Sequence, residues 1–413
     1  MANVSSSNSQ GALVPKLRFP EFENDSYTPE TVGSLFDHAS RRNADGKNGN
    51  VITNSAEHGL IPQRDFFDKD IAVEGNTSNY YIIKKGDFVY NPRKSTTAPY
   101  GPFNCYSLED EGIVSPLYTC LTPKHKEFTE YLLWYFKSPA WYSYIYHNGA
   151  QSGARHDRVG MTNDLMDGIP VNLPCLREQE KVSRFLSILD RRIAAQRKLV
   201  EFLKSYKRGV SSALFERRIR MKKSNGSPFA EWEKATLGDI FLERNEKALG
   251  GEKLIAVTIS NGIQDRSDLD LKDNSSEDKS NYRKVHVGDI AYNTMRMWQG
   301  ACGVSSFDGI VSPAYTVLYA SDKARSDSRY WAYLFKEIRM MQLFQRNSQG
   351  LTSDTWNLKY DKFAKIAIDV PSLEEQVVIA NVLDGFSSKI VICEDSLERM
   401  ERYKRSLLSK MFI

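Results

Sequence analysis

The sequence has few side chains that could hold a metal ion or build a disulfide framework. Its 413 residues include five cysteines and six histidines, and both kinds are scattered along the chain. The spacings typical of structural zinc sites and redox motifs, Cys-x-x-Cys and His-x-x-x-His, do not occur. This pattern indicates a reduced cytosolic protein, and we expect no metal site in it.

Long apolar runs are also missing. No stretch of about 18 consecutive apolar residues occurs, and residues 1–11 are rich in Ser and Asn instead of forming a basic and then apolar leader. We therefore expect a cytoplasmic protein without a membrane span.

Two catalytic motifs are absent as well. No Gly-x-x-x-x-Gly-Lys-Ser/Thr loop is present, so an ATP-driven motor is not expected in this chain. The Asn/Asp-Pro-Pro-aromatic motif of adenine methyltransferases is missing too, and Asn91-Pro92-Arg93 is the nearest sequence. We predict a binding protein with no catalytic residue and no bound cofactor.

What the sequence does contain is a long internal repeat. Five short blocks recur in the same order at offsets of 197 to 205 positions, which indicates two copies of one structural unit. The first-copy blocks are residues 31–33, 85–91, 113–116, 174–179 and 206–208, and they correspond to 236–238, 287–293, 310–313, 371–376 and 403–405.

Each copy ends in a predicted long helix. After Pro174 and after Pro371, apolar residues alternate in steps of four and three for about 40 residues, roughly 60 Å of helix, as in a coiled-coil seam. Lys207 and Lys404 interrupt the seam at the same position. Such a lysine could fix the register, or its ammonium group could extend into solvent.

Charge is distributed unevenly between the two helices. Residues 177–220 hold 13 Lys and Arg against 5 Asp and Glu, whereas residues 374–413 hold 6 against 7. The first helix could contact DNA phosphates, dock an acidic partner surface, or be a solvated helix face. The rest of the chain is slightly acidic, so phosphate contacts there would need local patches.

These features predict a domain plan. We expect a flexible tail at 1–14, a domain at 15–173, a helix at 174–220, a second domain at 221–370 and a helix at 371–413. Short β-type runs and turn signals mark both domains as mixed α+β structure. Each domain should also contain one aromatic-rich helix, near 127–147 and near 326–346.

Several of these sequences together resemble the specificity (S) subunit of type I restriction–modification systems. They are Pro15-Lys16-Leu17-Arg18-Phe19-Pro20-Glu21-Phe22, the Trp232 that leads into Thr236-Leu237-Gly238 (with Tyr27 in that position in the first copy), and the Pro-x-Leu-x-Glu-Gln openings and Tyr-Lys-Arg closings of both long helices. Their order and duplication, more than any single motif, carry the resemblance, which covers almost the whole chain after the tail.

The resemblance implies a fold and a set of partners. Each domain would be a target-recognition domain, and the two helices would pack as an antiparallel coiled coil with pseudo-two-fold symmetry, which suits two separated half-sites on double-stranded DNA. Two methyltransferase (M) subunits would carry the chemistry with S-adenosylmethionine. Restriction (R) subunits would bind ATP and Mg.

Candidate base-reading residues lie where the two copies stop agreeing. Two loops in each copy supply Arg, Gln and small polar side chains that suit contacts to bases and phosphates. The predicted DNA-binding residues are Asn91, Arg93, Lys94, Thr96, Gln151, Arg155 and Arg158 in the first copy, and Asn293, Arg296, Trp298, Gln299, Gln349, Thr352 and Ser353 in the second. Because the loops differ, we predict an asymmetric, bipartite target.

Two other functions stay open from the sequence. The chain could be a self-contained DNA methylase or nuclease with a divergent active site, or a two-domain scaffold or inhibitor that does not bind DNA. Activity of the purified chain would favour the first. Absence of salt-sensitive duplex binding in the presence of partners would favour the second.

Overall fold

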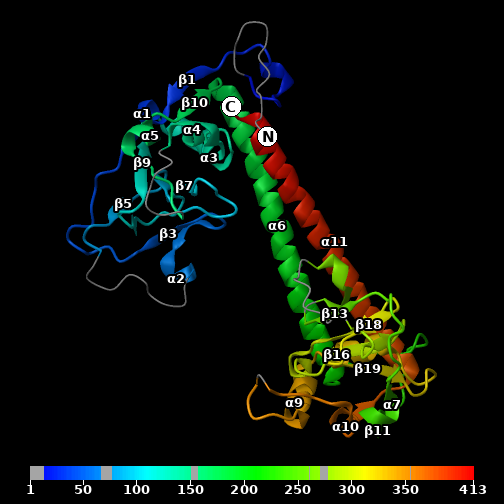
Figure 1. The fold of residues 1–413 in the computed structure, drawn as a ribbon. Coiled ribbons are helices and arrows are strands. Elements are labelled where there is room, and N and C mark those ends of the chain that lie inside the picture. Colours follow the sequence, from blue (N-terminus) through cyan, green and yellow to red (C-terminus); the bar gives the residue numbers. More distant parts are fainter. Residues whose placement is uncertain (1–13, 67–76, 150–156, 260, 270–277, 354) are drawn as a thin grey trace. The chain divides into compact units, whose positions relative to one another are not determined.

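The computed structural model describes residues 14–66, 77–149, 157–259, 261–269, 278–353 and 355–413. The chain divides into two compact units (Figure 1). Unit 1 comprises Met1–Arg197 and Asp395–Ile413, and unit 2 comprises Lys198–Glu394. Each unit therefore contains a globular part and a portion of both long helices, α6 (Leu176–Phe215) and α11 (Leu373–Met411).

Unit 1 is an α+β structure of small antiparallel sheets. Its four-stranded sheet has the order β2-β9-β6-β7, and three two-stranded sheets pair β1 with β10, β3 with β4 and β5 with β8. The strands are β1 (Thr28–Thr31), β2 (Phe36–His38), β3 (Ile52–Ser55), β4 (Gly59–Pro62), β5 (Tyr81–Ile83), β6 (Phe88–Tyr90), β7 (Phe103–Cys105), β8 (Gly112–Val114), β9 (Thr119–Pro123) and β10 (Pro170–Leu173). The short helices are η1 (Pro20–Phe22), α1 (Val32–Leu35), α2 (Gln63–Phe66), η2 (Lys126–Phe128), α3 (Thr129–Lys137), α4 (Tyr142–Asn148) and α5 (Asn163–Asp167).

Unit 2 repeats this sheet plan strand for strand. Its four-stranded sheet has the order β12-β19-β16-β17, and the pairs are β11 with β20, β13 with β14 and β15 with β18. The strands are β11 (Glu233–Thr236), β12 (Phe241–Glu243), β13 (Ile255–Thr258), β14 (Gly262–Asp265), β15 (Arg283–Val285), β16 (Ile290–Asn293), β17 (Cys302–Val304), β18 (Gly309–Val311), β19 (Tyr315–Ala320) and β20 (Ala367–Val370). The short helices are α7 (Leu237–Ile240), η3 (Arg266–Asp268), η4 (Met297–Gln299), α8 (Ser328–Leu334), α9 (Ile338–Asn347) and α10 (Tyr360–Phe363). The predicted α+β class and duplication are confirmed.

Aromatic side chains fill the core of each unit. In unit 1, Phe88 and Phe136 are nearly inaccessible and their ring centroids lie 5.8 Å apart. The prediction of one aromatic helix per unit was wrong, because each is two helices. In unit 1 the break follows α3 at Ser138, whose backbone is extended (ψ 163°). Pro139 comes next, and a proline disfavours the helical conformation of the residue before it.

The repeated Gly-Asp blocks form the turn that leads into β6 and β16. Gly86 and Gly288 have φ angles of +94° and +88°, a region that favours glycine. The Asp87 carboxylate accepts a hydrogen bond from the Lys84 amide (2.7 Å), and the matching aspartate in unit 2 accepts one from the His286 amide (2.9 Å). The same sequence thus sets the same strand entry twice.

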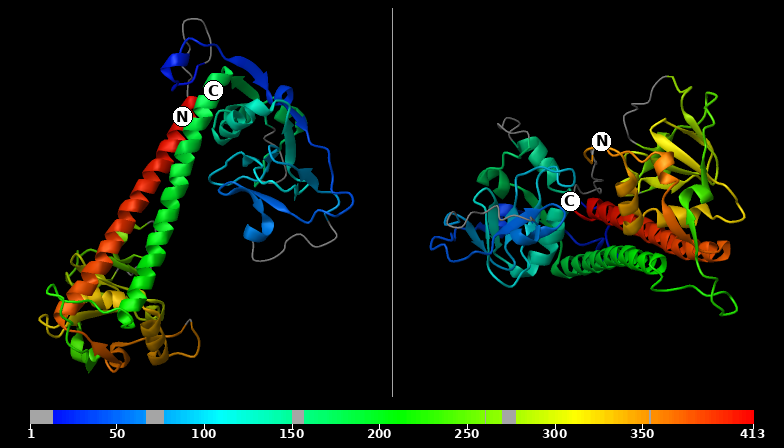
Figure 2. Two further views of the ribbon diagram at one scale, coloured as in Figure 1. Left: turned by 180° about the vertical axis from the view of Figure 1, so that it is seen from behind. Right: turned by 90° about the horizontal axis from the view of Figure 1, so that it is seen from below.

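In both units α6 and α11 lie side by side and antiparallel, as the views in Figure 2 show. Polar contacts join the two helices in each unit. They are Arg197–Glu401 and Asp190–Lys404 in unit 1, and Lys204–Glu394 and Lys207–Ser387 in unit 2. Part of the positive charge of α6 is therefore neutralised by carboxylates of α11, which is a fourth role for these charges besides the three expected from the sequence.

The lysines that interrupt the predicted seam bind the opposite helix. Lys207 donates a hydrogen bond to Ser387 Oγ (2.7 Å), and Lys404 forms an ion pair with Asp190. These two contacts are related by the 197-residue offset. Neither ammonium group is left without a partner, and burial lowers the pKa of Lys207.

The start of α6 anchors the globular part of unit 1. Glu178, almost fully buried, accepts hydrogen bonds from Arg18 Nε (2.9 Å) and Arg18 Nη2 (2.7 Å), and its carboxylate also contacts the Tyr27 hydroxyl (3.4 Å). Gln179 donates to the carbonyl of Pro174 at 2.8 Å. The Glu-Gln pair therefore has a structural role at the helix start.

The start of α11 does the same in unit 2 with a different aromatic partner. Glu375 accepts hydrogen bonds from Trp232 Nε1 (3.0 Å) and Arg220 Nη2 (3.4 Å). Gln376 donates to Pro371 O at 3.0 Å and accepts from the Asp327 amide at 3.0 Å. The tyrosine and tryptophan that the sequence placed in equivalent positions thus bind equivalent glutamates.

One window of α11 is apolar and long enough, by length and composition alone, to cross a membrane. Its mean hydropathy is 1.4, and 33% of it is buried inside the protein. Ile379, Ala380 and Leu383 from this stretch belong to the core of unit 2. A core helix of a soluble protein passes the same test, so the window is weak evidence for a membrane span.

Candidate nucleic-acid interface

In unit 1 the first candidate loop starts from a fixed strand end. Tyr90, the last residue of β6, is fully buried and its hydroxyl donates to Tyr100 O at 2.7 Å. Asn91 donates through Nδ2 to Asn54 O (3.1 Å), while its Oδ1 accepts from the Arg93 amide (3.0 Å). Asn91 therefore shapes the loop, and its amide group is engaged with the protein.

The two loops that the sequence proposed separately lie next to each other in unit 1. Arg93 and Arg158 form an antiparallel bridge, and the Lys94 amide donates to Asp157 O at 2.8 Å. Arg93, Lys94 and Thr96 are exposed, and Arg158 is half-buried. The other two predicted residues, Gln151 and Arg155, lie outside the described residues.

This part of unit 1 carries uncompensated positive charge. Within the ranges described above, Arg93, Lys94 and Arg158 have no side-chain ion pair. Guanidinium and ammonium groups free of carboxylates can bind phosphate oxygens, and a guanidinium can also donate two hydrogen bonds to a guanine.

In unit 2 the corresponding loop starts in the same way. Tyr292 is fully buried and donates to Leu358 O at 3.2 Å, and Asn293 Oδ1 accepts from the Met295 amide at 3.0 Å. The chain then turns through η4. Arg296 is exposed on this turn, and Trp298 and Gln299 are half-buried.

The second loop of unit 2 is closed by its own hydrogen bonds. Gln349 and Asn357 exchange both backbone hydrogen bonds, at 3.0 and 2.8 Å. Inside this pair, the Thr352 amide donates to Thr355 Oγ1 at 3.1 Å. Gly350 has a φ of +137°. A loop held at so many points presents its exposed side chains, those of Gln349, Thr352 and Ser353 among them, in fixed positions.

The two loops of unit 2 also form one surface. The Leu358 amide donates to Thr294 O at 2.9 Å, and the rings of Trp298 and Trp356 meet edge to face with centroids 5.1 Å apart. Trp356 is absent from the predicted set. The signal in the sequence that could have identified it is a tryptophan within the polar segment 352–357.

The two surfaces differ in chemistry. Unit 1 presents mainly cationic and hydroxyl groups, whereas unit 2 combines Arg296 with two tryptophans and the fully exposed Leu351 (101%). The larger apolar and aromatic side chains of unit 2 can contact the methyl group of thymine, whereas the cations of unit 1 suit acceptors such as guanine O6 and N7. The two copies therefore offer different base contacts from equivalent positions.

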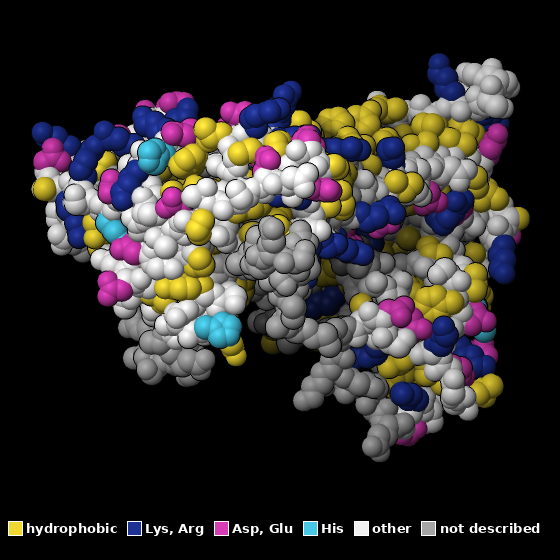
Figure 3. All heavy atoms as spheres, turned by 90° about the horizontal axis from the view of Figure 1, so that it is seen from above, with side chains coloured by type: hydrophobic (Ala, Val, Ile, Leu, Met, Phe, Trp, Pro, Cys, Tyr) yellow, Lys and Arg dark blue, Asp and Glu magenta, His cyan; other side chains and the backbone are white. Residues whose placement is uncertain are grey.

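Charge on the wider surface is mixed. Figure 3 shows Lys and Arg side chains interspersed with Asp and Glu over the face drawn there. Among the described residues, no group of three His, Cys, Asp or Glu side chains is placed to hold a metal ion. The candidate interface thus consists of the local loop surfaces.

Comparisons with known proteins all find similarity to proteins of type I restriction–modification systems. Residues 230–402 match the family described as type I restriction modification DNA specificity domain. A protein of Methanocaldococcus jannaschii, named as a putative type I restriction enzyme MjaX specificity subunit, is 22% identical over 297 residues, or 68% of this chain. The match spans 65% of that relative's length, which is slightly less than two thirds.

Two solved structures share the fold. A chain from work on complex assembly and conformational transition of the type I R-M system gives a TM-score of 0.55 at 14% identity and covers 92% of this chain and 96% of its own length. The S subunit of a type I restriction-modification system from M. genitalium gives 0.52 at 14% identity, covering 97% and 99%.

Proposed function

Because residues 230–402 match the type I restriction modification DNA specificity domain family, we propose that the chain is the sequence-specific DNA-recognition subunit of a type I restriction–modification system. The observation that carries the proposal is the pair of adjacent loops at the end of β6 and again at the end of β16. In each unit these loops would read one half-site of double-stranded DNA.

The target would be asymmetric and bipartite. Equivalent strands deliver Arg93 and Lys94 in unit 1 but Arg296 and Trp298 in unit 2. Identical half-sites would require identical donors and acceptors at the base edges, and these loops do not provide them. Methylation-sensitive sequencing of a host that expresses the system tests this, and a palindromic motif would refute it.

A loop variant gives the matched control for that experiment. Arg296→Ala should relax one position in a single half-site and leave the other half-site unchanged. Lys365→Ala, an exposed lysine that none of these loops includes, should leave the whole motif unchanged. Relaxation in both half-sites would contradict the assignment of one half-site to each unit.

The chemistry would come from partner subunits. Two methyltransferase subunits would bind S-adenosylmethionine, and restriction subunits would bind ATP and Mg, all in the cytoplasm. Leu199, Phe202 and Tyr206 on α6 are exposed and apolar or aromatic, which supports a docking role for this helix. The purified chain alone should not methylate or cleave DNA when both S-adenosylmethionine and Mg are supplied.

A further inference from the structure

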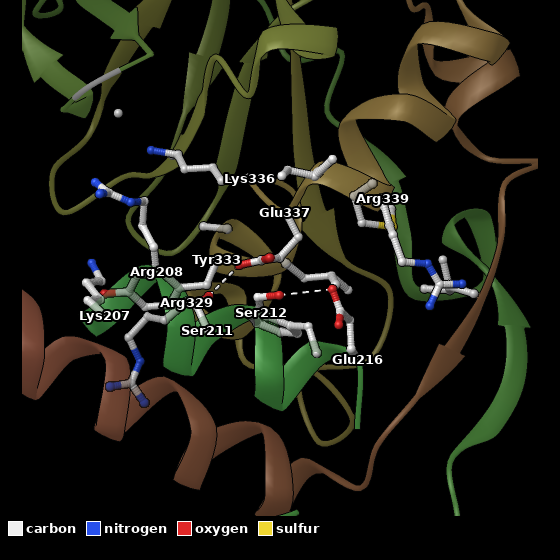
Figure 4. A pocket seen from close by; sticks show the side chains of 18 of the residues that line it. Lys207, Arg208, Ser211, Ser212, Glu216, Arg329, Tyr333, Lys336, Glu337 and Arg339 are labelled. Atoms are coloured by element: carbon white, nitrogen blue, oxygen red, sulfur yellow. Dashed lines mark hydrogen bonds between the residues drawn. The ribbon is translucent and has the colours of Figure 1, made fainter. Parts of the chain in front are cut away.

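Unit 2 contains a cavity of about 950 Å³ whose lining includes none of the predicted DNA-reading residues. One wall is a single face of α6, with Lys204, Lys207, Arg208, Ser211, Ser212 and Phe215 at helical spacing. The opposite wall is the corner between α8 and α9 (Figure 4). A third side is contributed by Ile259 and by residues 261–263.

Charged side chains of both signs line this cavity, but the acidic ones are already engaged. Four carboxylates line it, and each has a partner inside the unit. Their contacts are Glu216 with Arg218 (2.8 Å), Glu337 with Ser211 (2.5 Å), Asp369 with Arg217 (3.1 Å) and Asp384 with Arg329 (2.9 Å).

Five of the eight cationic side chains in the lining form no ion pair with a carboxylate of the described residues. One of them, Lys207, donates only to the hydroxyl of Ser387. Within the described part of the chain, Arg208, Lys234 and Arg339 make no side-chain hydrogen bond or ion pair. Lys336 reaches only the carbonyl of Ile259, at 3.4 Å. With eight cations and four carboxylates the lining carries a net charge of 8 − 4 = +4, so it is complementary to an anionic ligand.

The lining is also apolar at its mouth. Ile338 is 68% exposed and Ile259 is 50% exposed, although both are large hydrophobic side chains. Nucleic-acid phosphates would use the cations and leave these side chains against water. A peptide with acidic and apolar residues would use both, because burying the isoleucines and pairing the cations are each favourable.

We propose that this cavity binds an acidic peptide segment of a partner protein, with one or two large apolar side chains between Asp or Glu residues. Its volume falls within the range of about 300–1,000 Å³ that ligand pockets occupy, which corresponds to a segment of a few residues. None of the predicted DNA-reading residues lines this site, so both could be occupied in the same molecule.

Fluorescence anisotropy of the full chain tests the proposal. The probe is a fluorescein-labelled peptide in which two leucines alternate with glutamates and aspartates, and the reference probe has serine in place of leucine. The leucine peptide should bind, and raising the salt concentration should weaken it. Arg208→Glu and Arg339→Glu should each reduce its affinity about tenfold or more, since each removes a charge-assisted contact.

Further variants separate this site from general attraction to a basic protein. Ile338→Ser should weaken the leucine peptide and leave the serine peptide unchanged. Lys323→Glu and Lys365→Glu change exposed lysines of unit 2 outside the cavity and should have no effect. Circular dichroism should be the same for every variant, because all these positions are exposed.

Three results would overturn the proposal. The first is equal binding of the two peptides, and the second is equal loss in a control lysine variant. The third is displacement of the peptide by a short DNA oligonucleotide whose own binding depends on Arg208 and Arg339, which would make the cavity a nucleic-acid site. Arg296→Ala should leave peptide binding intact, so a failure here is distinguishable from a failure of the DNA-reading assignment.

Discussion

Replacing Glu178 and Glu375 by glutamine, one at a time, tests whether the repeated Glu-Gln motif contributes equally to the stability of the two units. Both carboxylates are buried, with side chains 2% and 1% exposed. Their partners differ. Arg18 is 6% exposed and binds Glu178 through two nitrogens, whereas Arg220 is 28% exposed and lies 3.4 Å from Glu375.

These differences set the expected magnitudes. Glu178→Gln leaves the buried Arg18 guanidinium without its carboxylate, and breaking such a pair costs about 3–5 kcal/mol. Glu375→Gln keeps an oxygen for Trp232, and Arg220 still has Glu231 at 2.8 Å. This second change should cost about 1–2 kcal/mol, the range of a weakened hydrogen bond.

Hydrogen exchange of the full chain in increasing urea, read by mass spectrometry, reports each unit separately. Glu178→Gln should lower the free energy of unfolding of unit 1, and Glu375→Gln that of unit 2 by less. Glu180→Gln is the matched control, because this neighbouring glutamate is exposed. Equal losses in the two units, or a loss below about 1 kcal/mol for Glu178→Gln, would refute the buried-pair reasoning.

Three further predictions concern unit 2. Arg296→Ala should weaken DNA binding by about 1–3 kcal/mol in a competition assay and relax one base position; equal loss on every sequence would make it a phosphate contact. Gly350→Ala should abolish discrimination between base sequences in one half-site, because a Cβ there would lie 2.5 Å from Thr355 O and the φ angle is +137°. Gly385→Ala is the control and should leave discrimination unchanged, because a Cβ at that position meets nothing within 4 Å. Burial raises the pKa of Glu337, so the folded protein binds a proton at this carboxyl group more tightly than the unfolded chain does. Urea midpoints should therefore fall as pH rises through that raised pKa, and Glu337→Gln should remove this slope; an unchanged slope would contradict it.

The sequence was sufficient for the parts of the fold that rest on local pattern. The Gly-Asp blocks predicted turns, and Gly86 and Gly288 do have the left-handed backbone that such turns use. The alternating apolar residues predicted two long helices with a common seam. These features depend on residues close together in the chain, so their spacing is visible without a structure.

Contacts between distant segments could not be predicted in the same way. Arg93 and Arg158 are 65 positions apart, and only the bridge between their loops brings them together. Trp298 and Trp356 are a similar case. The break between α3 and α4 shows the opposite error, because an aromatic pattern at helical spacing predicted one helix through Ser138, where the backbone is extended.

Comparing the two copies distinguishes the repeated backbone framework from the side chains that this framework exposes. Asn91 and Asn293 make the same contact, accepting a hydrogen bond at 3.0 Å from the amide two residues later, and each follows a buried tyrosine. The residues that follow them share no such constraint. Because the turn is held by the asparagine, its neighbours could change without disturbing the sheet. Equivalent frames that present different side chains are what a protein needs in order to read two different half-sites with one fold.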